Sequence, residues 1–165
     1  MKINTKSTLT AAMLTALAVS LSTFAIPIGA SKCFPIQHLC NVIAGVFLGP
    51  GYGVAMAFCT SLIRNLIGTG SPLAFPGSMV GAFLCGFLYQ HTGKLAAAYF
   101  GEVFGTGIIG GLLCYPVATL LMGQEAALFA YVIPFLISTA GGTVMAMILV
   151  GALYQSGAMS YLKGV

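Results

Sequence analysis

Charged residues are scarce in this sequence: only 5% of its 165 residues are charged, whereas 59% are hydrophobic. Soluble domains carry about 25% charged residues, so a soluble chain of this size could not cover its surface with so few. Lipid removes that difficulty, because a surface that faces lipid favours apolar side chains. The composition therefore indicates an integral membrane protein, and the length fits one domain.

Aspartate is absent altogether, since both acidic residues of the chain are glutamates. There is also no HExxH, GxSxG or CxxC spacing, so no catalytic residues are predicted. No Walker A motif is present, and any ATP must be hydrolysed by another chain, which leaves no cofactor for this one. The net charge of +4 is not gathered into a basic run, which argues against a nucleic-acid partner.

The cysteines show no redox or metal-binding spacing. Cys59, Cys85 and Cys114 lie in hydrophobic segments, where a thiol usually packs as a small apolar side chain. Cys33 and Cys40 are near enough in sequence to pair at the outer surface, and the sequence leaves their redox state open.

Apolar segments separated by turn residues predict an all-α bundle of six transmembrane helices in a single domain over residues 1–165. The first segment follows Lys2 and Lys6 and holds about 20 apolar residues, enough to cross a bilayer. A membrane helix is therefore expected there rather than a cleaved signal peptide. The predicted helices cover residues 7–26, 35–48, 52–67, 77–90, 95–121 and 127–154.

The charges also predict an orientation in the membrane. Six helices place both termini on one side, and Lys2, Lys6, Lys94 and Lys163 then fall on that side. By the positive-inside rule this side is cytoplasmic, whereas Lys32 and Glu125 face outward. The longer loops, residues 27–34 and 68–77, are then external, which suggests a site that opens outward.

Small residues recur at four-residue spacing, which lets helices approach closely in lipid. On the first helix, Ala12, Ala16 and Ser20 form such a stripe. It either packs against a neighbouring helix or offers a flat docking strip to another membrane protein. Similar pairs on the fifth and sixth helices are Gly101/Gly105, Gly107/Gly111 and Ser138/Gly142.

The second predicted helix carries most of the polar groups. Polar side chains at membrane depth are costly to bury, so each is a candidate functional residue. Gln37 and Asn41 share a helix face, and His38 is a neighbour of Asn41. Together they form a hydrogen-bonding wall for a small polar ligand, or else hold helices together. Because His91 lies at the opposite membrane face, no metal site is predicted.

Charged groups on the third and fifth helices are further candidates. Arg64 and Asn65 lie near the outer end of the third helix, where the arginine either reaches the surface or pairs with a carboxylate. Glu102 is the one acidic residue inside a predicted helix, nearer the cytoplasmic end. Because the depths of Arg64 and Glu102 differ, no ion pair is predicted. Glu102 either binds ligand, closes the cytoplasmic end or hydrogen-bonds to neighbouring helices.

Aromatic residues complete the predicted site. Pro116 interrupts the hydrogen bonds of the fifth helix, and Tyr115 beside it can stack on a flat ligand and donate a hydrogen bond. Phe34 and Phe75 fall in the two outer loops, where they are candidate lids.

Three sequence blocks resemble a known family. The strings FPIQHLCNVIAGVFLGPGYG (residues 34–53), SLIRNLIGTGSPLAFPGS (61–78) and GEVFGTGIIGGLLCYP (101–116) are similar to the ThiW family. Its members are substrate-binding S components of energy-coupling-factor (ECF) transporters. The resemblance implies a six-helix protein in the cell membrane of a prokaryote. Such a protein binds a vitamin or vitamin precursor from outside, then topples in the membrane to deliver it.

The resemblance also implies partners and a ligand. S components join one transmembrane coupling protein and two ABC ATPases, and they dock through an AxxxA face on the first helix, which Ala12 and Ala16 match. The implied ligand is hydroxyethylthiazole, the thiazole precursor of thiamin. This molecule is small, flat and uncharged, and it suits an apolar slot with a few hydrogen bonds. The candidate ligand-binding residues are Phe34, Gln37, His38, Asn41, Arg64, Asn65, Phe75, Glu102 and Tyr115.

Other functions stay open at the level of sequence. The nearest is an S component for another thiamin-related or small heterocyclic ligand. A membrane enzyme would use Glu102, His38 or cysteine thiols, but no catalytic spacing supports it. A small channel or an autonomous multidrug carrier conflicts with the loops that cap the outer side.

Overall fold

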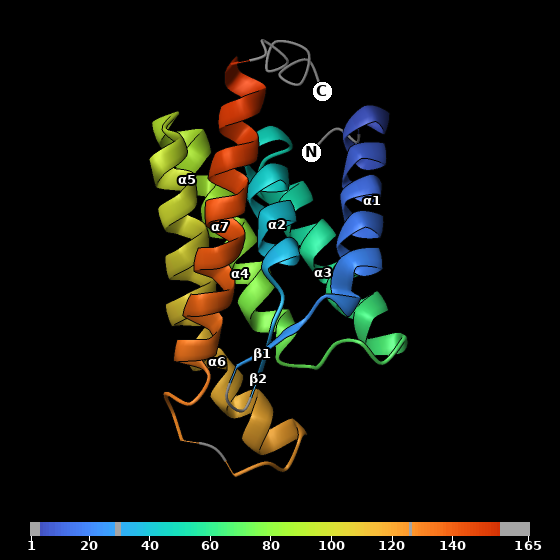
Figure 1. Cartoon of the computed structure of the whole chain (residues 1–165), viewed down its shortest axis with the longest axis vertical. Helices are drawn as coiled ribbons and strands as arrows, with labels where there is room; N and C mark the ends of the chain where they lie inside the picture. The colour runs from blue at the N-terminus through green and yellow to red at the C-terminus, as the bar shows by residue number, and fades with distance from the viewer. Residues whose placement is uncertain (1–3, 29–30, 126, 156–165) are drawn as a thin grey trace.

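The chain folds into six helical runs and one short β-hairpin within the residues that the structure describes. The computed structural model describes residues 4–28, 31–125 and 127–155, so Lys2 and Lys163 lie outside it. The predicted helical fold is confirmed (Figure 1). The runs are α1 (Thr5–Ser20), α2 (Pro35–Phe47), α3 (Pro50–Leu66), α4 (Ala74–Thr92), the continuous run Leu95–Leu121, and α7 (Val132–Gln155).

The hairpin corrects the prediction for residues 20–34. Helix α1 ends at Ser20 and is followed by one 3₁₀ turn, η1 (Leu21–Thr23), rather than continuing to Ile26. Strand β1 (Ile26–Ile28) then pairs antiparallel with β2 (Ser31–Cys33), and Ile26 lies opposite Cys33. The physical reason is Pro27, which disfavours helical geometry at the residue before it and so keeps Ile26 extended.

Two helices begin at other residues than the spacing predicts. Helix α4 begins at Ala74 instead of residue 77, and α7 begins at Val132 instead of residue 127. Pro76 and Pro134 lie in the first turns, where the backbone N–H groups have no intrahelical partner, so proline removes no hydrogen bond. Phe75 therefore belongs to a helix and not to a loop.

The fifth helical run changes from α-helical to π-helical winding twice along its length. It consists of α5 (Leu95–Glu102), the π-helix η2 (Val103–Gly110), α6 (Gly111–Pro116) and the π-helix η3 (Val117–Leu121). The second change follows Pro116, which lacks an N–H and crowds the preceding turn. The first change follows Glu102. Wide turns of this kind are frequent at functional sites.

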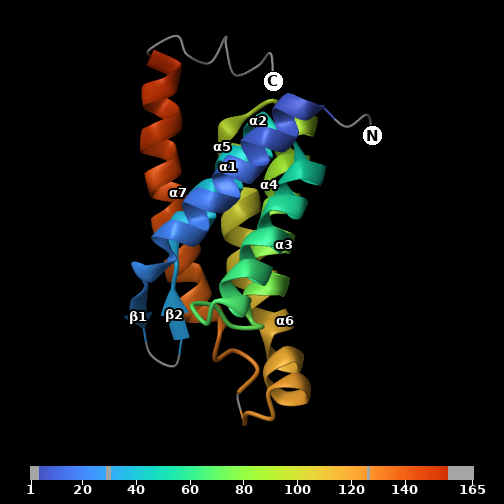
Figure 2. The ribbon, with the colours of Figure 1, turned by 90° about the vertical axis from the view of Figure 1, so that its right-hand side faces the viewer.

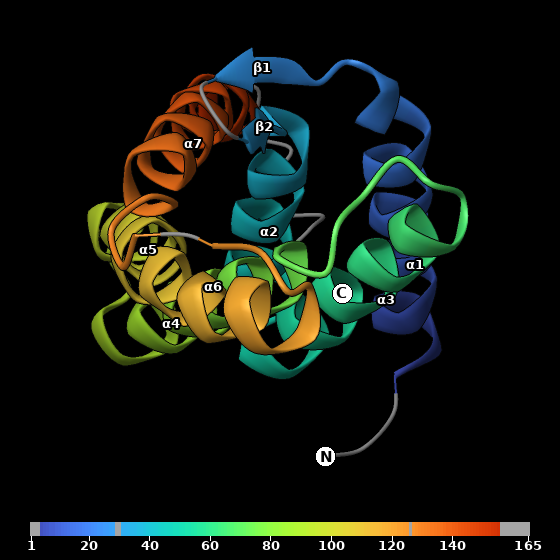
Figure 3. The same cartoon turned by 90° about the horizontal axis from the view of Figure 1, so that it is seen from below.

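Helix α2 lies at the centre of the bundle. It packs against α1, α3, α4, α5 and α7, and the view along the bundle shows it enclosed by these helices (Figure 3). It is only 13 residues long, and the hairpin occupies the space beyond its first residue (Figures 1 and 2). The polar groups of α2 are therefore held inside the protein, at the hairpin end.

Glycines allow the helices around α2 to touch backbone to backbone. A Cβ at Gly105 would lie 2.9 Å from the Cα of Gly81, so η2 and α4 are in direct contact. Gly101 lies against the backbone of Leu84 on α4, whereas Gly111 lies against Val132 at the start of α7. The two predicted GxxxG pairs thus face two different neighbours.

The exterior of the bundle is apolar. Large hydrophobic side chains such as Leu9, Phe83, Phe100 and Ile148 are exposed on four different helical runs. Two runs of the described residues are long and apolar enough to cross a membrane: Leu95–Leu121, with mean hydropathy 1.7, and α7, with mean hydropathy 2.0. A surface of this kind suits lipid, because lipid tails are themselves apolar.

The close contact at Gly105 yields a stability prediction. We expect Gly105→Leu to lower the free energy of unfolding in detergent by about 1–3 kcal/mol or more, because the new side chain has no space. Gly151→Leu is the matched control, since outside its own helix no described atom lies within 4 Å of a Cβ there. Denaturant unfolding followed by circular dichroism measures both, and equal losses would contradict the packing.

Candidate functional site

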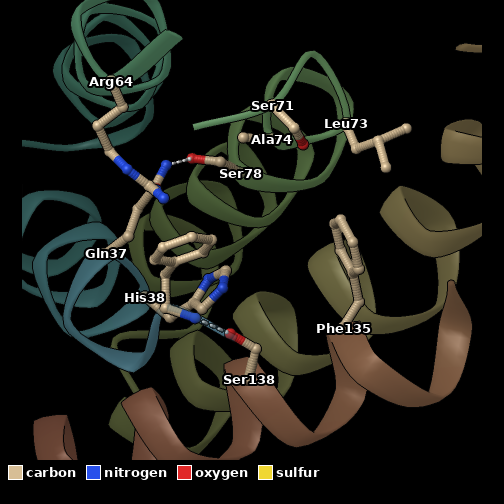
Figure 4. A pocket seen from close by; sticks show the side chains of 10 residues that line it. Gln37, His38, Arg64, Ser71, Leu73, Ala74, Ser78, Phe135 and Ser138 are labelled. Carbon is tan, nitrogen blue, oxygen red and sulfur yellow. Dashed lines mark hydrogen bonds between the residues drawn. The ribbon is translucent and has the colours of Figure 1, made fainter. Parts of the chain in front are cut away.

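A pocket opens at the hairpin end of the bundle, between α2, α3, α4 and α7. It holds about 420 Å³ of empty space, including the space at its mouth. Leu73 and Phe135 form an apolar wall across from Arg64 and Gln37 (Figure 4). The residues that line it are Phe34, Gln37, His38, Arg64, Ser71, Leu73, Ala74, Ser78, Phe135 and Ser138.

The start of α2 positions one side of this pocket. Pro35 is the first residue of α2, where its fixed φ angle suits a helix start. Its neighbour Phe34 donates its backbone N–H to Ser138 Oγ on α7 at 2.8 Å. Gly142, one turn further along α7, lies so close to His38 that a Cβ there would be 2.6 Å from the His38 Cβ. These contacts seat α2 against α7 and aim His38 inward.

Arg64 places a positive charge in the pocket wall. Its side chain is fully buried, and it contacts no carboxylate among the described residues. The guanidinium donates from Nη1 to Gln37 Oε1 and from Nη2 to the Thr69 carbonyl at 3.4 Å. Its Cζ atom lies 3.6 Å from the ring centroid of Phe34, a cation–π contact. The Nε atom has no partner in the described chain.

Glu102 places a negative charge behind the same wall. It is fully buried, and its Oε1 atom lies 2.9 Å from His38 Nδ1. The same oxygen accepts a hydrogen bond from Asn41 Nδ2 at 3.0 Å, and Thr106 Oγ1 lies 3.2 Å from it. Its Oε2 atom has no partner among the described residues. Glu102 itself does not line the pocket.

A chain of hydrogen bonds joins the two charges. Gln37 accepts from Arg64 and donates from Nε2 to Ser78 Oγ at 2.7 Å. Asn41 donates toward Ser78 and Glu102. The cation turns the Gln37 carbonyl toward itself, and the carboxylate turns the Asn41 amide toward itself. Because buried charges must be paired or hydrogen-bonded, these amides let one cation and one anion lie in one core without touching.

The structure places four of the nine predicted ligand-binding residues in the pocket wall, namely Phe34, Gln37, His38 and Arg64. Asn41 and Glu102 are fully buried and lie behind that wall. The sequence offered no ground to predict an ion pair between Arg64 and Glu102, and in the structure His38 is the ionisable partner of Glu102.

The other three predicted residues lie elsewhere. Asn65 donates to the Ser61 carbonyl at 2.7 Å and the Ser71 carbonyl at 3.0 Å, so it holds the loop before α4. Phe75 packs on Phe58, with ring centroids 5.7 Å apart. Neither Phe75 nor Tyr115 lines the pocket, so neither stands as a lid or stacking residue there.

Sequence reasoning missed several residues of the wall. Ser78 and Ser138 are polar residues in apolar helices, which was a usable signal, but Ser138 reads equally well as a small packing residue. Phe135 is one of many phenylalanines, and nothing in the pattern distinguishes it. The loop residues Ser71 and Leu73 enter the wall only because the loop before α4 folds back over the end of α3.

The five cysteines are all free thiols, and all five lie within the described residues. Cys33 and Cys40 do not pair: Cys33 Sγ donates to the Pro134 carbonyl at 3.2 Å, and Cys40 is fully buried in the core. Burial raises the pKa of the Cys33 thiol. This answers the question that the sequence left open about these two residues.

The arrangement has a counterpart among solved structures. The structure described as the S component of a bacterial ECF transporter superposes with a TM-score of 0.75 and 21% sequence identity, over 91% of this chain and 96% of that one. This protein therefore has the fold of an ECF S component, with its pocket at one end of the helical bundle.

The family follows from the sequence comparison. The family model of ThiW, described as thiamine-precursor transporter protein, matches residues 8–156, and the chain belongs to this family. The resemblance predicted from the three sequence blocks is confirmed. The protein is accordingly a transporter component and not an enzyme. No curated protein sequence matches it significantly.

The separated charges predict an energetic coupling. We expect Arg64→Met and Glu102→Gln together to destabilise the protein less than the sum of the single changes, by about 0.5–3 kcal/mol. Either single change leaves one buried charge without its opposite, and the double change leaves neither. Unfolding free energies of the four proteins in detergent measure this coupling.

The control cycle pairs Glu102→Gln with Lys94→Met. Lys94 is exposed, and solvent and salt screen its charge, so these two changes should be additive. A coupling at Lys94 as large as the one at Arg64, or no coupling at Arg64, would contradict the charge balance.

Proposed function

We propose that this protein is the substrate-binding S component of an ECF vitamin importer and that it captures hydroxyethylthiazole from the outer face of the cell membrane. Uptake is then driven by ATP hydrolysis in partner subunits, namely a transmembrane coupling protein and two ABC ATPases. The family and the fold support the transport role, and the pocket supports the ligand.

The charge balance of the pocket is the observation that carries the ligand assignment. The Arg64 cation is offset by the buried Glu102 anion through Gln37, Ser78 and Asn41. A neutral ligand keeps this balance, whereas a phosphorylated one would bring negative charge that a single guanidinium does not match. Phe34 and Phe135 supply aromatic surface on the pocket lining, which suits a flat heterocycle.

The position of the lysines relative to the pocket supports the proposed orientation in the membrane. Lys6 and Lys94 lie at the start of α1 and of α5, at the end of the bundle opposite the pocket (Figure 1). Lys32 and Glu125 belong to the hairpin and to the segment before α7, at the pocket end. With six membrane-spanning helices and cytoplasmic termini, the positive-inside rule turns the pocket outward.

Helix α1 supports the docking role of its small-residue stripe. Ala12, Ala16 and Ser20 are all exposed, so they do not pack against the described part of the chain. Small side chains on an exposed helix face let another membrane helix approach closely. The face that α1 turns inward consists of Ser7, Ala11, Thr15 and Ala18.

Ligand binding is tested by calorimetry. Purified protein in detergent should bind hydroxyethylthiazole with sub-micromolar affinity, and the phosphorylated thiazole should bind at least about tenfold more weakly, because its charge is not balanced. Heat with thiamin but none with hydroxyethylthiazole would reassign the protein to another thiamin-related ligand.

Docking is tested by uptake. Ala12→Leu with Ala16→Leu should abolish uptake of labelled hydroxyethylthiazole in cells that contain the coupling module, while calorimetry shows unchanged ligand binding. Ala140→Leu on α7, also an exposed position, is the matched control and should leave uptake intact. Loss of ligand binding in the double variant would show that the stripe supports the pocket instead.

A further inference from the structure

His38 and Glu102 belong to the same site but lie at different depths from the pocket. His38 lines the pocket, and Glu102 lies behind it, with Oε1 2.9 Å from His38 Nδ1. We propose that Glu102 is a positioning residue that holds the His38 proton on Nδ1, so that Nε2 turns an unshared electron pair into the pocket. The pocket then selects ligands that carry a hydroxyl group able to donate to Nε2. The ligand part of this inference rests on the proposed function.

The neighbours of Glu102 favour a proton on His38 rather than on the Glu102 carboxylate. Asn41 donates an N–H group to Oε1. Thr106 Oγ1 and His38 Nδ1 lie within hydrogen-bond distance of the same oxygen. An oxygen that accepts from two such donors acts as a carboxylate acceptor. In the proposed arrangement the Nδ1–H of His38 donates to Glu102 Oε1, which accepts as a carboxylate oxygen.

With Nδ1 engaged by Glu102, Nε2 is the ring nitrogen of His38 left for the pocket that this residue lines. Within the described residues its imidazole has one side-chain partner, Glu102 at Nδ1, and what remains accessible of it lies on the pocket lining. The wall already holds the Arg64 cation, which Glu102 offsets. A neutral imidazole keeps the site neutral, whereas a second proton on His38 would leave it with a net positive charge in a medium of low dielectric constant.

The two sides of the pocket therefore offer opposite chemistry. Arg64 lines one side with a guanidinium whose Nε has no partner within the described residues, and His38 is proposed to offer an acceptor on the other side. A ligand that fits both has a hydroxyl group at one end and an acceptor such as a ring nitrogen at the other. Hydroxyethylthiazole has this pattern. An analogue that carries a 2-oxopropyl group, a methyl ketone, in place of the hydroxyethyl group does not have it, because both ends would then be acceptors.

The proton position can be measured without any ligand. The chain has two histidines, and His91 is exposed, so His91→Gln leaves His38 as the only imidazole. Nitrogen NMR of the histidine-labelled His91→Gln protein in detergent should show Nδ1 protonated and Nε2 bare. Addition of Glu102→Gln should give a mixture of both tautomers, because a glutamine amide can donate as well as accept. A protonated Nε2 in the ligand-free His91→Gln protein would overturn the proposal.

The selectivity is measured by comparing the alcohol with the ketone. The native protein should bind hydroxyethylthiazole about ten- to a hundredfold more tightly than the ketone, since the ketone leaves the acceptor on His38 unsatisfied. In Glu102→Gln this ratio should fall toward one. If Glu102 had only a structural role, both affinities would fall equally and the ratio would not change, which would overturn the positioning role.

The two experiments separate the two claims. If the native protein binds neither compound, the proposed ligand is wrong, and the NMR result alone then decides whether Glu102 positions the His38 proton. If the alcohol binds without preference over the ketone, the transport function stands and the selectivity inference falls.

Discussion

The rest of the site depends on the burial of one guanidinium and one carboxylate in the same helical core without direct contact. Arg64 and Glu102 are both fully buried, and an isolated charge in such a medium is strongly unfavourable. The amides of Gln37 and Asn41, with the hydroxyl of Ser78 between them, connect the two charges. Because each amide is oriented by the charge it faces, the donors and acceptors of the pocket wall are oriented as well.

This arrangement requires helices that lie very close together. Glu102 reaches α2 because η2 and α4 touch at Gly105 and Gly81, and because α7 approaches His38 at Gly142. Larger residues at these positions would widen the bundle. The donors and acceptors would then lie farther apart than a hydrogen bond allows. In a lipid environment, where apolar side chains gain nothing by leaving the solvent, close backbone packing and interhelical hydrogen bonds are the available sources of association. The glycines and the hydrogen bonds between Arg64 and Glu102 therefore both hold the helices together.

The pocket, the lysines and the small-residue stripe lie on three different parts of the bundle. The pocket lies at the hairpin end, the lysines of α1 and α5 lie at the other, and the stripe of Ala12, Ala16 and Ser20 is exposed on the side. Between the two ends the core is filled by the close packing of α2 with its neighbours. Under the proposed function, a ligand bound at the pocket end would therefore cross the membrane with the protein or through a partner. This geometry is consistent with a binding subunit that depends on other chains for energy and for release.

The sequence by itself determined the class of environment, the order of the helices and the family, because composition, apolar periodicity and the three long blocks are local properties of the chain. It also identified Gln37, His38 and Arg64, since polar groups are conspicuous in apolar segments. Only the tertiary structure decided which of the polar residues lie together in the pocket wall. Glu102 and His38 are far apart in sequence, and Asn65 and Tyr115 looked equally suitable until the fold placed them elsewhere. The hairpin and the early start of α4 also escaped prediction, because proline tolerates both a first helical turn and an extended strand, and the neighbouring helices select between them.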